Sequence, residues 1–151
     1  MRIALFEPDI AGNVGAILRT AACFGADVDL IEPMGFAWSE RALARAGMDY
    51  VRNVTVRRHA DWDAFCATAD TRIVLFTTRG ATPLPQAKLH SDDILLFGSE
   101  SAGVPEAVHE RADARVLIPM RAGMRSLNIS VSVGIATAEA LRQTDGWPVA
   151  G

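Results

Sequence analysis

Short runs of apolar residues alternate along the chain with longer segments in which apolar residues recur at helical spacing. Most of the apolar runs have no polar interruption, as is typical of strands covered by helices on both faces of a parallel sheet. We therefore predict an α/β fold in one domain over residues 1–151, with ligands beyond the carboxyl ends of the strands. The predicted strands are residues 3–6, 28–31, 51–56 (the weakest), 72–77, 94–97 and 116–118. The predicted helices are residues 14–24, 39–46, 61–69 and 105–111.

Capping residues mark the ends of several predicted helices. Asn13 is expected to be the N-cap of the first helix, and Gly25 is expected to end it. Ser39 is expected to cap the second helix and Gly47 to stop it. Pro105 suits the first position of the fourth helix, where its missing N–H costs nothing.

Residues 129–135 fit two kinds of structure equally well. The sequence Ile-Ser-Val-Ser-Val-Gly-Ile alternates strictly and is rich in β-branched residues, which is typical of a strand. However, Ile129, Val133, Ala136 and Ala140 also recur at helical spacing. The residues alone leave both structures open.

Two loops after predicted strands hold candidate functional residues. The first contains Asn13 and Arg19, although a helix cap and a solvent-exposed arginine would explain them simply. The second contains Gly98, Glu100 and Gly103 between a buried strand and a helix. Small residues let a ligand approach the backbone closely, and a plain tight turn would need only one glycine. A ligand-binding loop is therefore favoured there.

A third loop packs Arg121, Arg125, Ser126 and Asn128 into eight residues after a strand. A solvated loop that ends in a helix cap would also account for these residues. The residues alone do not decide between a site and a solvated loop.

Composition narrows the classes of protein that the chain can be. Of the 151 residues, 50% are hydrophobic and 22% are charged, so a folded globular protein is expected. No apolar run reaches the roughly 18 residues of a membrane span, and the N-terminus is not a signal peptide. The two cysteines form no disulfide framework, so we expect a cytoplasmic protein without membrane contact.

The sequence shows no pattern typical of a metal site or of a common nucleotide-binding loop. His59, His90 and His109 have no partner at metal-binding spacing, so they are expected at the surface or internally satisfied, and no metal is expected. No G-x-G-x-x-G follows the first strand, and there is no Walker A sequence.

The net charge of −3 excludes a protein that coats nucleic acid by bulk charge, but it leaves room for a local basic face. Fourteen of the 15 basic residues are arginines, which can bind phosphate bidentately. Residues 41–58 contain five arginines against a single acid, Asp49: Arg41, Arg45, Arg52, Arg57 and Arg58.

The three loops resemble the motifs of a known enzyme family, the SPOUT-class RNA 2′-O-methyltransferases. The similar segments are Asn13-x-Gly15-x-x-x-Arg19-Thr20, Phe97-Gly98-x-Glu100-x-x-Gly103-Val104-Pro105, and Ile118-Pro119-Met120 with Arg125-Ser126-Leu127-Asn128-Ile129-Ser130. Residues 31–38 and 45–50 resemble the branch that methylates the wobble nucleotide of tRNA. The resemblance covers residues 2–143, with the motifs in order.

This resemblance implies a parallel α/β sheet with a trefoil knot near the C-terminus, and S-adenosylmethionine bound in the knot. It implies a homodimer whose active site is completed by the second subunit. It also implies that residues 129–143 form a helix. The implied reaction is methyl transfer to the ribose 2′-hydroxyl of nucleotide 34, C or U, in the anticodon stem-loop of tRNA.

Site residues follow from the resemblance position by position. Arg19 matches the catalytic arginine, and the polar residues around it are matched by Asn13, Glu100 and Asn128. The cofactor contacts are matched by Phe76, Gly98, Ile118 and Ser126, with Thr77, Gly103 and Leu127 as neighbours. Val131 and Ala138 stand where close relatives often have asparagine and tyrosine, which puts details of RNA docking or of the dimer surface in doubt.

A guanidinium holds its proton too firmly to act as a base at neutral pH. We therefore expect Arg19 to bind phosphate and stabilise the developing alkoxide, while water or Glu100 takes the proton. Arg121 and Arg125, beside the cofactor loop, are the first candidates for RNA-backbone contacts, and the arginines of residues 41–58 are the second.

Three alternatives remain at this stage. The chain could methylate another RNA position, or it could be a non-catalytic RNA-binding module with the same fold. It could also be a small serine hydrolase that uses Ser101, although the nucleophile elbow G-x-S-x-G is incomplete there.

Overall fold

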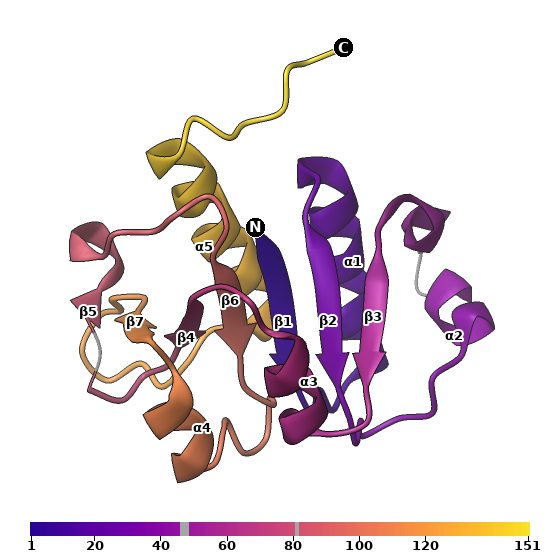
Figure 1. The fold of residues 1–151 in the computed structure, drawn as a ribbon, viewed down its shortest axis with the longest axis horizontal. Helices are drawn as coiled ribbons and strands as arrows, with labels where there is room; N and C mark the ends of the chain where they lie inside the picture. The colour runs from indigo at the N-terminus through magenta and orange to yellow at the C-terminus, as the bar shows by residue number, and fades with distance from the viewer. Residues whose placement is uncertain (46–48, 81) are drawn as a thin grey trace.

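A computed structural model describes residues 1–45, 49–80 and 82–151, and it arranges seven strands in one parallel sheet. The strand order is β3-β2-β1-β6-β4-β7-β5 (Figure 1). The strands are β1 (Arg2–Phe6), β2 (Asp27–Ile31), β3 (Val56–His59), β4 (Ile73–Phe76), β5 (Thr82–Pro83), β6 (Ile94–Phe97) and β7 (Ala114–Leu117). The helices are α1 (Ala11–Phe24), α2 (Glu40–Arg45), α3 (Trp62–Thr68), α4 (Glu106–Arg111), α5 (Ile129–Gln143) and two 3-10 helices, η1 (Asp49–Asn53) and η2 (Leu84–Gln86).

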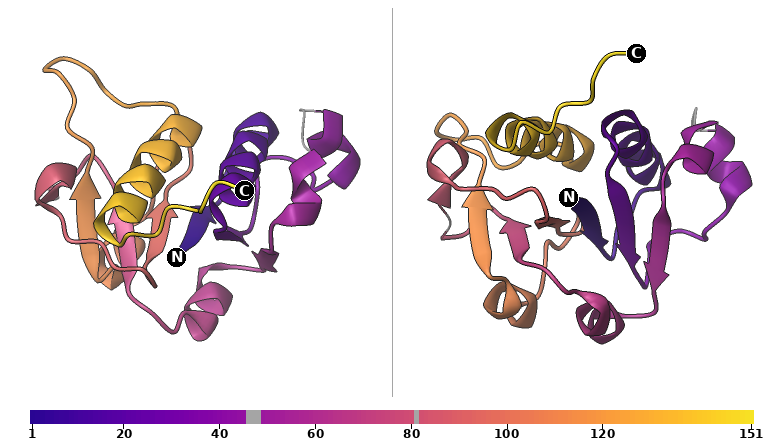
Figure 2. Two further views of the ribbon diagram at one scale, coloured as in Figure 1. Left: turned by 90° about the horizontal axis from the view of Figure 1, so that it is seen from above. Right: turned by 45° about the horizontal axis from the view of Figure 1, so that its top comes forward.

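Helices cover both faces of the sheet, as the uninterrupted apolar strands predict. Figure 2 shows α1 and α5 side by side on one face and α3 and α4 on the other. Successive residues of a strand point to opposite faces, so Ile3 and Leu5 pack in the core under α1 and α5. Ala4 and Phe6 pack in the second core under α3 and α4. The α/β architecture is therefore confirmed, while the trefoil knot stays a prediction.

Helix α5 resolves the ambiguity at residues 129–135 in favour of a helix. It spans Ile129–Gln143, and Val133, Ala136 and Ala140 are buried in the core that α5 shares with α1. The strict alternation of this segment does not reflect a strand. In the helix, Val131 and Ile135 lie on the exposed side.

The strand expected at residues 51–56 is wrong over most of its length. Residues 49–53 form the 3-10 helix η1, and the strand lies at Val56–His59, in parallel register with β2. As the edge strand of the sheet, β3 tolerates polar side chains, and Arg57 pairs with Asp27 at 3.1 Å. The apolar pattern therefore misplaced this strand, and it also missed the two-residue strand β5.

The capping predictions are partly right. Gly25 ends α1 with φ of +71°, and Ser39 Oγ accepts the backbone N–H of Ala42 at 3.2 Å. However, α1 begins at Ala11 and its N-cap is Ile10, so Asn13 is not the cap. Asn13 lies in the first turn, which frees its side chain for another partner. Pro105 is the N-cap of α4 rather than its first residue. Gly47 lies outside the described residues.

A buried group of charged side chains ties the first three strands together. Asp29 of β2 is fully buried and accepts two hydrogen bonds from Arg2, at 2.8 and 2.9 Å. His59 Nε2 lies 2.7 Å from Oδ1 of the same carboxylate. His59 is therefore internally satisfied, as expected. No helix in the described part of the chain is long and apolar enough to span a membrane.

Candidate active site

A cavity of about 630 Å³ lies beyond the carboxyl ends of β4, β6 and β7. This volume is in the range of small-molecule sites, roughly 300–1,000 Å³. All three loops predicted from sequence contribute to its walls. The predicted residues that line it are Asn13, Phe76, Thr77, Gly98, Gly103, Glu100, Ile118, Ser126, Leu127 and Asn128.

Two stacked aromatic rings form an apolar wall of this cavity. Phe76 and Phe97 end the neighbouring strands β4 and β6 and are paired in register. Their ring centroids are 5.0 Å apart, with planes 13° from parallel. The next residue after β4, Thr77, is held to the sheet by a backbone hydrogen bond to Val116 at 2.9 Å. Apolar and hydrogen-bonding groups thus lie together at the strand ends.

The loop from Gly98 to Pro105 folds back on itself. Ser99 and Gly103 exchange two backbone hydrogen bonds of 2.9 Å, and Gly103 has φ of +63°. A Cβ at Gly98 would lie 2.6 Å from the carbonyl carbon of Gly103, so only glycine fits there. Both glycines therefore have a structural reason in closing the loop, and the closed loop presents Glu100 to the cavity.

Glu100 is the titratable group most altered by its surroundings in this cavity. Its Oε2 accepts the backbone N–H of Asp9 at 3.0 Å, while Oε1 is buried without a hydrogen-bond partner among the described residues. Burial raises the pKa of Glu100, although backbone N–H groups of Asp9 and Ile10 oppose the shift. A buried acceptor without a partner, facing a cavity, is suited to receive a hydrogen bond or a proton from a ligand.

Asn13 and Asn128 meet at the cavity from opposite ends of the sequence. Asn128 Nδ2 donates to Asn13 Oδ1 at 3.2 Å. Asn128 is also the N-cap of α5, because its Oδ1 accepts the backbone N–H of Ser130 at 2.8 Å. This hydrogen bond fixes the starts of α1 and α5 next to one another.

Three of the predicted arginines do not line the cavity. Arg19 is exposed on α1, with its guanidinium carbon 5.0 Å from the ring centre of Tyr50. Arg121 and Arg125 are exposed on the loop between β7 and α5. Met120 and Ser126 of the same loop do reach the cavity, so these two arginines flank it.

The sequence analysis missed His109 as a cavity residue. It was expected at the surface or satisfied, but it is 4% exposed and lines the cavity from α4. The ring makes no hydrogen bond within the part of the chain that the structure describes. No local signal in the sequence marks this position, because His109 belongs to none of the motifs and is buried only by the packing of α4 on the sheet.

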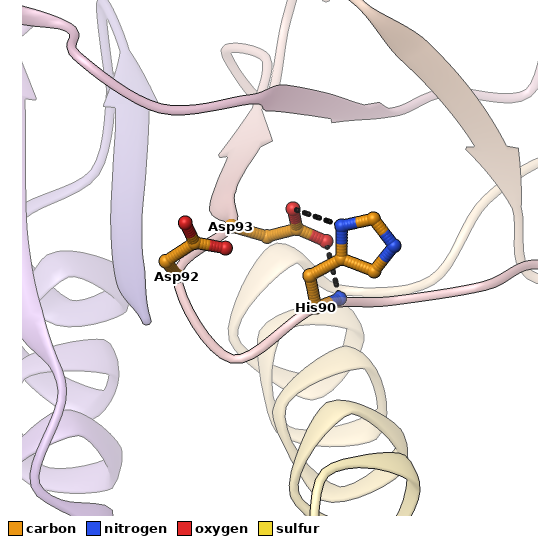
Figure 3. A group of neighbouring side chains, drawn as sticks. All are labelled: His90, Asp92 and Asp93. Atoms are coloured by element: carbon orange, nitrogen blue, oxygen red, sulfur yellow. Dashed lines mark hydrogen bonds and ion pairs between the residues drawn. The ribbon is translucent and has the colours of Figure 1, made fainter.

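A separate group of potential metal ligands lies at the amino end of β6. His90, Asp92 and Asp93 gather there, and His90 Nδ1 is 4.0 Å from Asp93 Oδ1 (Figure 3). Arg72 donates two hydrogen bonds to the buried Asp93 carboxylate, at 2.9 and 2.7 Å, and the backbone N–H of His90 donates a third at 2.8 Å. Because arginine already neutralises this carboxylate, the group is a structural turn rather than a cation site.

Comparisons with known proteins match the whole architecture. The model of the SpoU rRNA Methylase family matches residues 1–138. A tRNA (cytidine(34)-2′-O)-methyltransferase of Ancylobacter novellus is 46% identical over 150 residues, which cover 97% of this chain and 95% of that protein.

Solved structures agree with this match. One, on the 2-OH methylation of C/U34 on tRNA, is 42% identical with a TM-score of 0.89 and covers 94% of each chain. An AdoMet-bound rRNA methyltransferase from Sinorhizobium meliloti is 29% identical with a TM-score of 0.84, over 93% of this chain and 55% of that one.

Proposed function

Because the chain belongs to the SpoU rRNA Methylase family, we propose that it methylates the ribose 2′-hydroxyl of nucleotide 34, C or U, in tRNA. One observation supports this proposal most strongly: three motif loops that are far apart in sequence enclose one cavity. The chain that carries them is similar to a tRNA (cytidine(34)-2′-O)-methyltransferase over 97% of its length. Residues 1–151 act as one domain, and we place the enzyme in the cytoplasm with its tRNA substrate.

The cavity suits S-adenosylmethionine, the methyl donor of this family. It has the volume, an apolar wall at Phe76 and Phe97, and an unpartnered acceptor at Glu100. Phe76, Gly98, Ile118 and Ser126 would hold the cofactor, with Thr77, Gly103 and Leu127 as neighbours. When bound, the cofactor supplies an activated methyl group on its sulfonium.

The polar residues of the cavity then act on the ribose hydroxyl. Glu100 Oε1 accepts the proton, because it is the buried acceptor without a partner. The amides of Asn13 and Asn128 orient the hydroxyl, since their mutual hydrogen bond fixes both side chains. Arg19 stabilises the negative charge that develops on the oxygen and the neighbouring phosphate.

Arg19 needs a second copy of the chain to reach a cavity, and we infer a homodimer. It does not line the cavity of its own chain, and its guanidinium lies over the ring of Tyr50. The small residues Ala136 and Ala140 of α5 are already used against the core, but Val131 is 49% exposed and Ile135 is 37% exposed. These exposed apolar side chains suit burial against another copy.

Two exposed sets of arginines are candidates for binding the tRNA backbone. Arg121 and Arg125, which flank the cavity, remain the first choice. The second set is reduced, because Arg57 pairs with Asp27 and Arg58 pairs with Glu32. Its members that make no ion pair within the described part of the chain are Arg41, Arg45 and Arg52, all exposed.

The test is methyl transfer from labelled S-adenosylmethionine to tRNA carrying C34 or U34, followed by mapping of the methylated nucleotide. We expect label on the ribose of nucleotide 34 and none on tRNA with a 2′-deoxyribose there. Label at another nucleotide would support a different RNA position. Binding of S-adenosylhomocysteine without any transfer would support a non-catalytic module.

A further inference from the structure

Three segments that are distant in sequence meet at Asp9, in the loop that follows β1. The Asp9 carboxylate accepts both the backbone N–H of Ser101, at 3.0 Å, and its hydroxyl, at 2.5 Å. In return, the backbone N–H of Asp9 donates to Glu100 Oε2 at 3.0 Å. The loop after β1 and the loop after β6 are thus joined in both directions, at the residues on either side of one peptide bond.

A third segment, the loop between β2 and α2, packs closely against the backbone of Pro8 and Asp9. The backbone N–H of Gly35 donates to the carbonyl of Pro8 at 2.9 Å. A Cβ at Gly35 would lie 2.8 Å from Asp9 Cα and 2.9 Å from Asp9 O. Because backbone atoms cannot yield as a flexible side chain does, the position of Asp9 depends on glycine at residue 35.

We propose that Asp9 is a positioning residue that fixes the Glu100 carboxylate for proton transfer, and that Gly35 sets the position of Asp9. This inference rests on the proposed function, in which Glu100 takes the proton of the ribose hydroxyl. Oε1 of Glu100 has no partner among the described residues, so the backbone N–H groups that hold the carboxyl, those of Asp9 and the neighbouring Ile10, determine where this free oxygen points.

The hydrogen bonds between Asp9 and Ser101 are strong enough to hold the loop after β1 in place. The hydrogen bonds from Ser101 lower the pKa of Asp9, so its carboxylate is charged at neutral pH and its hydrogen bonds are charge-assisted. Glu7, two residues before Asp9, has φ of +45°, a strained conformation for a non-glycine residue. The chain turns sharply at Glu7, and this turn places Asp9 within hydrogen-bond distance of Ser101.

The loop between β2 and α2, which contains Gly35, leads to the arginines that are the second candidates for RNA contacts. It continues through Trp38, whose ring lies 5.3 Å from the guanidinium carbon of Arg58, into α2 with the exposed Arg41 and Arg45. Asp9 thus lies between Glu100, to which it donates a hydrogen bond, and Gly35, from which the chain continues to these arginines.

The experiment compares Asp9→Ala, Asp9→Asn and Gly35→Ala with the wild type, as full-length chains with tRNA as substrate. Readouts are kcat, the KM for tRNA, the dissociation constant of S-adenosylhomocysteine, the melting temperature and the pH–rate profile. Asp63→Asn, at an exposed aspartate of α3 that does not line the cavity, is the matched control for Asp9. Gly12→Ala, where a Cβ has no atom within 4 Å, is the matched control for Gly35.

We expect Asp9→Ala to lower kcat by about 10- to 100-fold with little change in KM, because a displacement of about 1 Å at a reacting group has that effect. Weakening the hydrogen bond to Glu100 raises the pKa of its carboxyl, so the acid limb of the profile moves to higher pH. Asp9→Asn keeps an acceptor for Ser101 and restores most of the rate. Gly35→Ala, which keeps the Asp9 side chain but displaces its backbone, reproduces the loss.

Two results would overturn the inference. One is a kcat and pH profile of Asp9→Ala equal to those of the wild type; the other is a loss in Asp9→Asn as large as that in Asp9→Ala. If Asp9→Ala does not fold, Gly35→Ala decides alone, and wild-type kinetics in that variant refute the proposal. A wild type that binds S-adenosylhomocysteine but methylates no tRNA refutes the proposed function itself, and the role of Asp9 with it.

Discussion

Asn128 Nδ2 donates a hydrogen bond of 3.2 Å to Asn13 Oδ1, across 115 positions of sequence. The same Asn128 caps α5 through its Oδ1, so the residue has one structural and one site-building contact. Serine caps a helix as well as asparagine does, but its short hydroxyl cannot reach Asn13. We expect Asn128→Ser to keep the melting temperature and to lower kcat about 10-fold or more.

Asn128→Ala separates the two contacts of Asn128 further. It should lose a similar rate and in addition about 1 kcal/mol of stability, the usual cost of a lost cap. Asp61→Ala is the control, because Asp61 caps α3 by accepting the N–H of Ala64 at 2.8 Å, far from the cavity. It should lose comparable stability with unchanged methyl transfer. Wild-type turnover in Asn128→Ser would restrict Asn128 to capping.

Replacing Glu100 with glutamine should have opposite effects on stability and on turnover. Burial raises the pKa of Glu100 above its ordinary 4.5. A carboxyl with a raised native-state pKa favours the fold below its ordinary pKa, and that contribution is lost as the pH rises through the native-state value. Glu100→Gln, which is neutral throughout, should therefore gain stability relative to the wild type between about pH 4 and pH 8, while losing methyl transfer.

Urea unfolding at the two pH values measures this difference, with Glu106→Gln as the control at an exposed carboxylate of α4. A stability difference that does not change with pH, or full activity of Glu100→Gln, would show that the charge of Glu100 has no such role.

Arg121 and Arg125 should reveal RNA contacts through salt dependence. Each phosphate contact that is removed should lower the slope of log affinity against log salt by about one. We expect this from Arg121→Ala and Arg125→Ala, with binding of S-adenosylhomocysteine unchanged. Arg111→Ala is the control, because Arg111 ends α4 shortly before the amino end of β7, whereas Arg121 and Arg125 follow the carboxyl end of that strand. Equal slopes in all four proteins would place the RNA elsewhere.

Subunit complementation tests whether Arg19 serves the cavity of a second copy. Arg19→Ala and Glu100→Ala should each be inactive alone, since both residues are placed in the catalytic machinery. When the two are refolded together in equal amounts, heterodimers with one intact site should restore about a quarter of the wild-type rate. A stable heterodimer without any recovered activity would contradict a site shared between subunits.

Asp29 should dominate the stability of the first three strands. Asp29→Ala leaves Arg2 and His59 without their shared carboxylate, and breaking a buried ion pair costs about 3–5 kcal/mol. Asp70→Ala is the control, because Asp70 is 82% exposed and lies 3.6 Å from the same Arg2. It should cost less than about 1 kcal/mol. Equal losses in the two variants, measured by urea unfolding, would refute the role of burial.

Local signals were sufficient for most of the fold. Apolar runs located β1, β2, β4 and β6, because strands covered on both faces are mostly apolar. The exception in β2 is Asp29, whose buried carboxylate pairs with Arg2 and His59. The edge strand β3 was misplaced, since a strand paired on one side can carry Arg57 and Arg58. Likewise, α1 begins at Ala11 and Asn13 is bonded to Asn128 instead of capping the helix, a contact that no local pattern contains.

In the candidate site, too, local motifs revealed some residues, while others depend on contacts between distant parts of the chain. The glycine-rich loop and the polar loop before α5 carried visible motifs, and their residues do line one cavity. In contrast, Asp9 and His109 belong to no motif; their roles arise from contacts with Ser101 and from burial against the strand ends. Arg19 carried a motif, yet it lies outside the cavity of its own chain.

The position of β1 between β2 and β6 has a consequence for synthesis on the ribosome. The first half of the chain can assemble β1, β2 and β3 as soon as it emerges, and β1 then presents an unpaired edge. That edge stays open until residues 94–97 leave the exit tunnel, and an open apolar edge can pair with other chains. Slow translation between β3 and β6 would lengthen this exposure, whereas rapid translation shortens it.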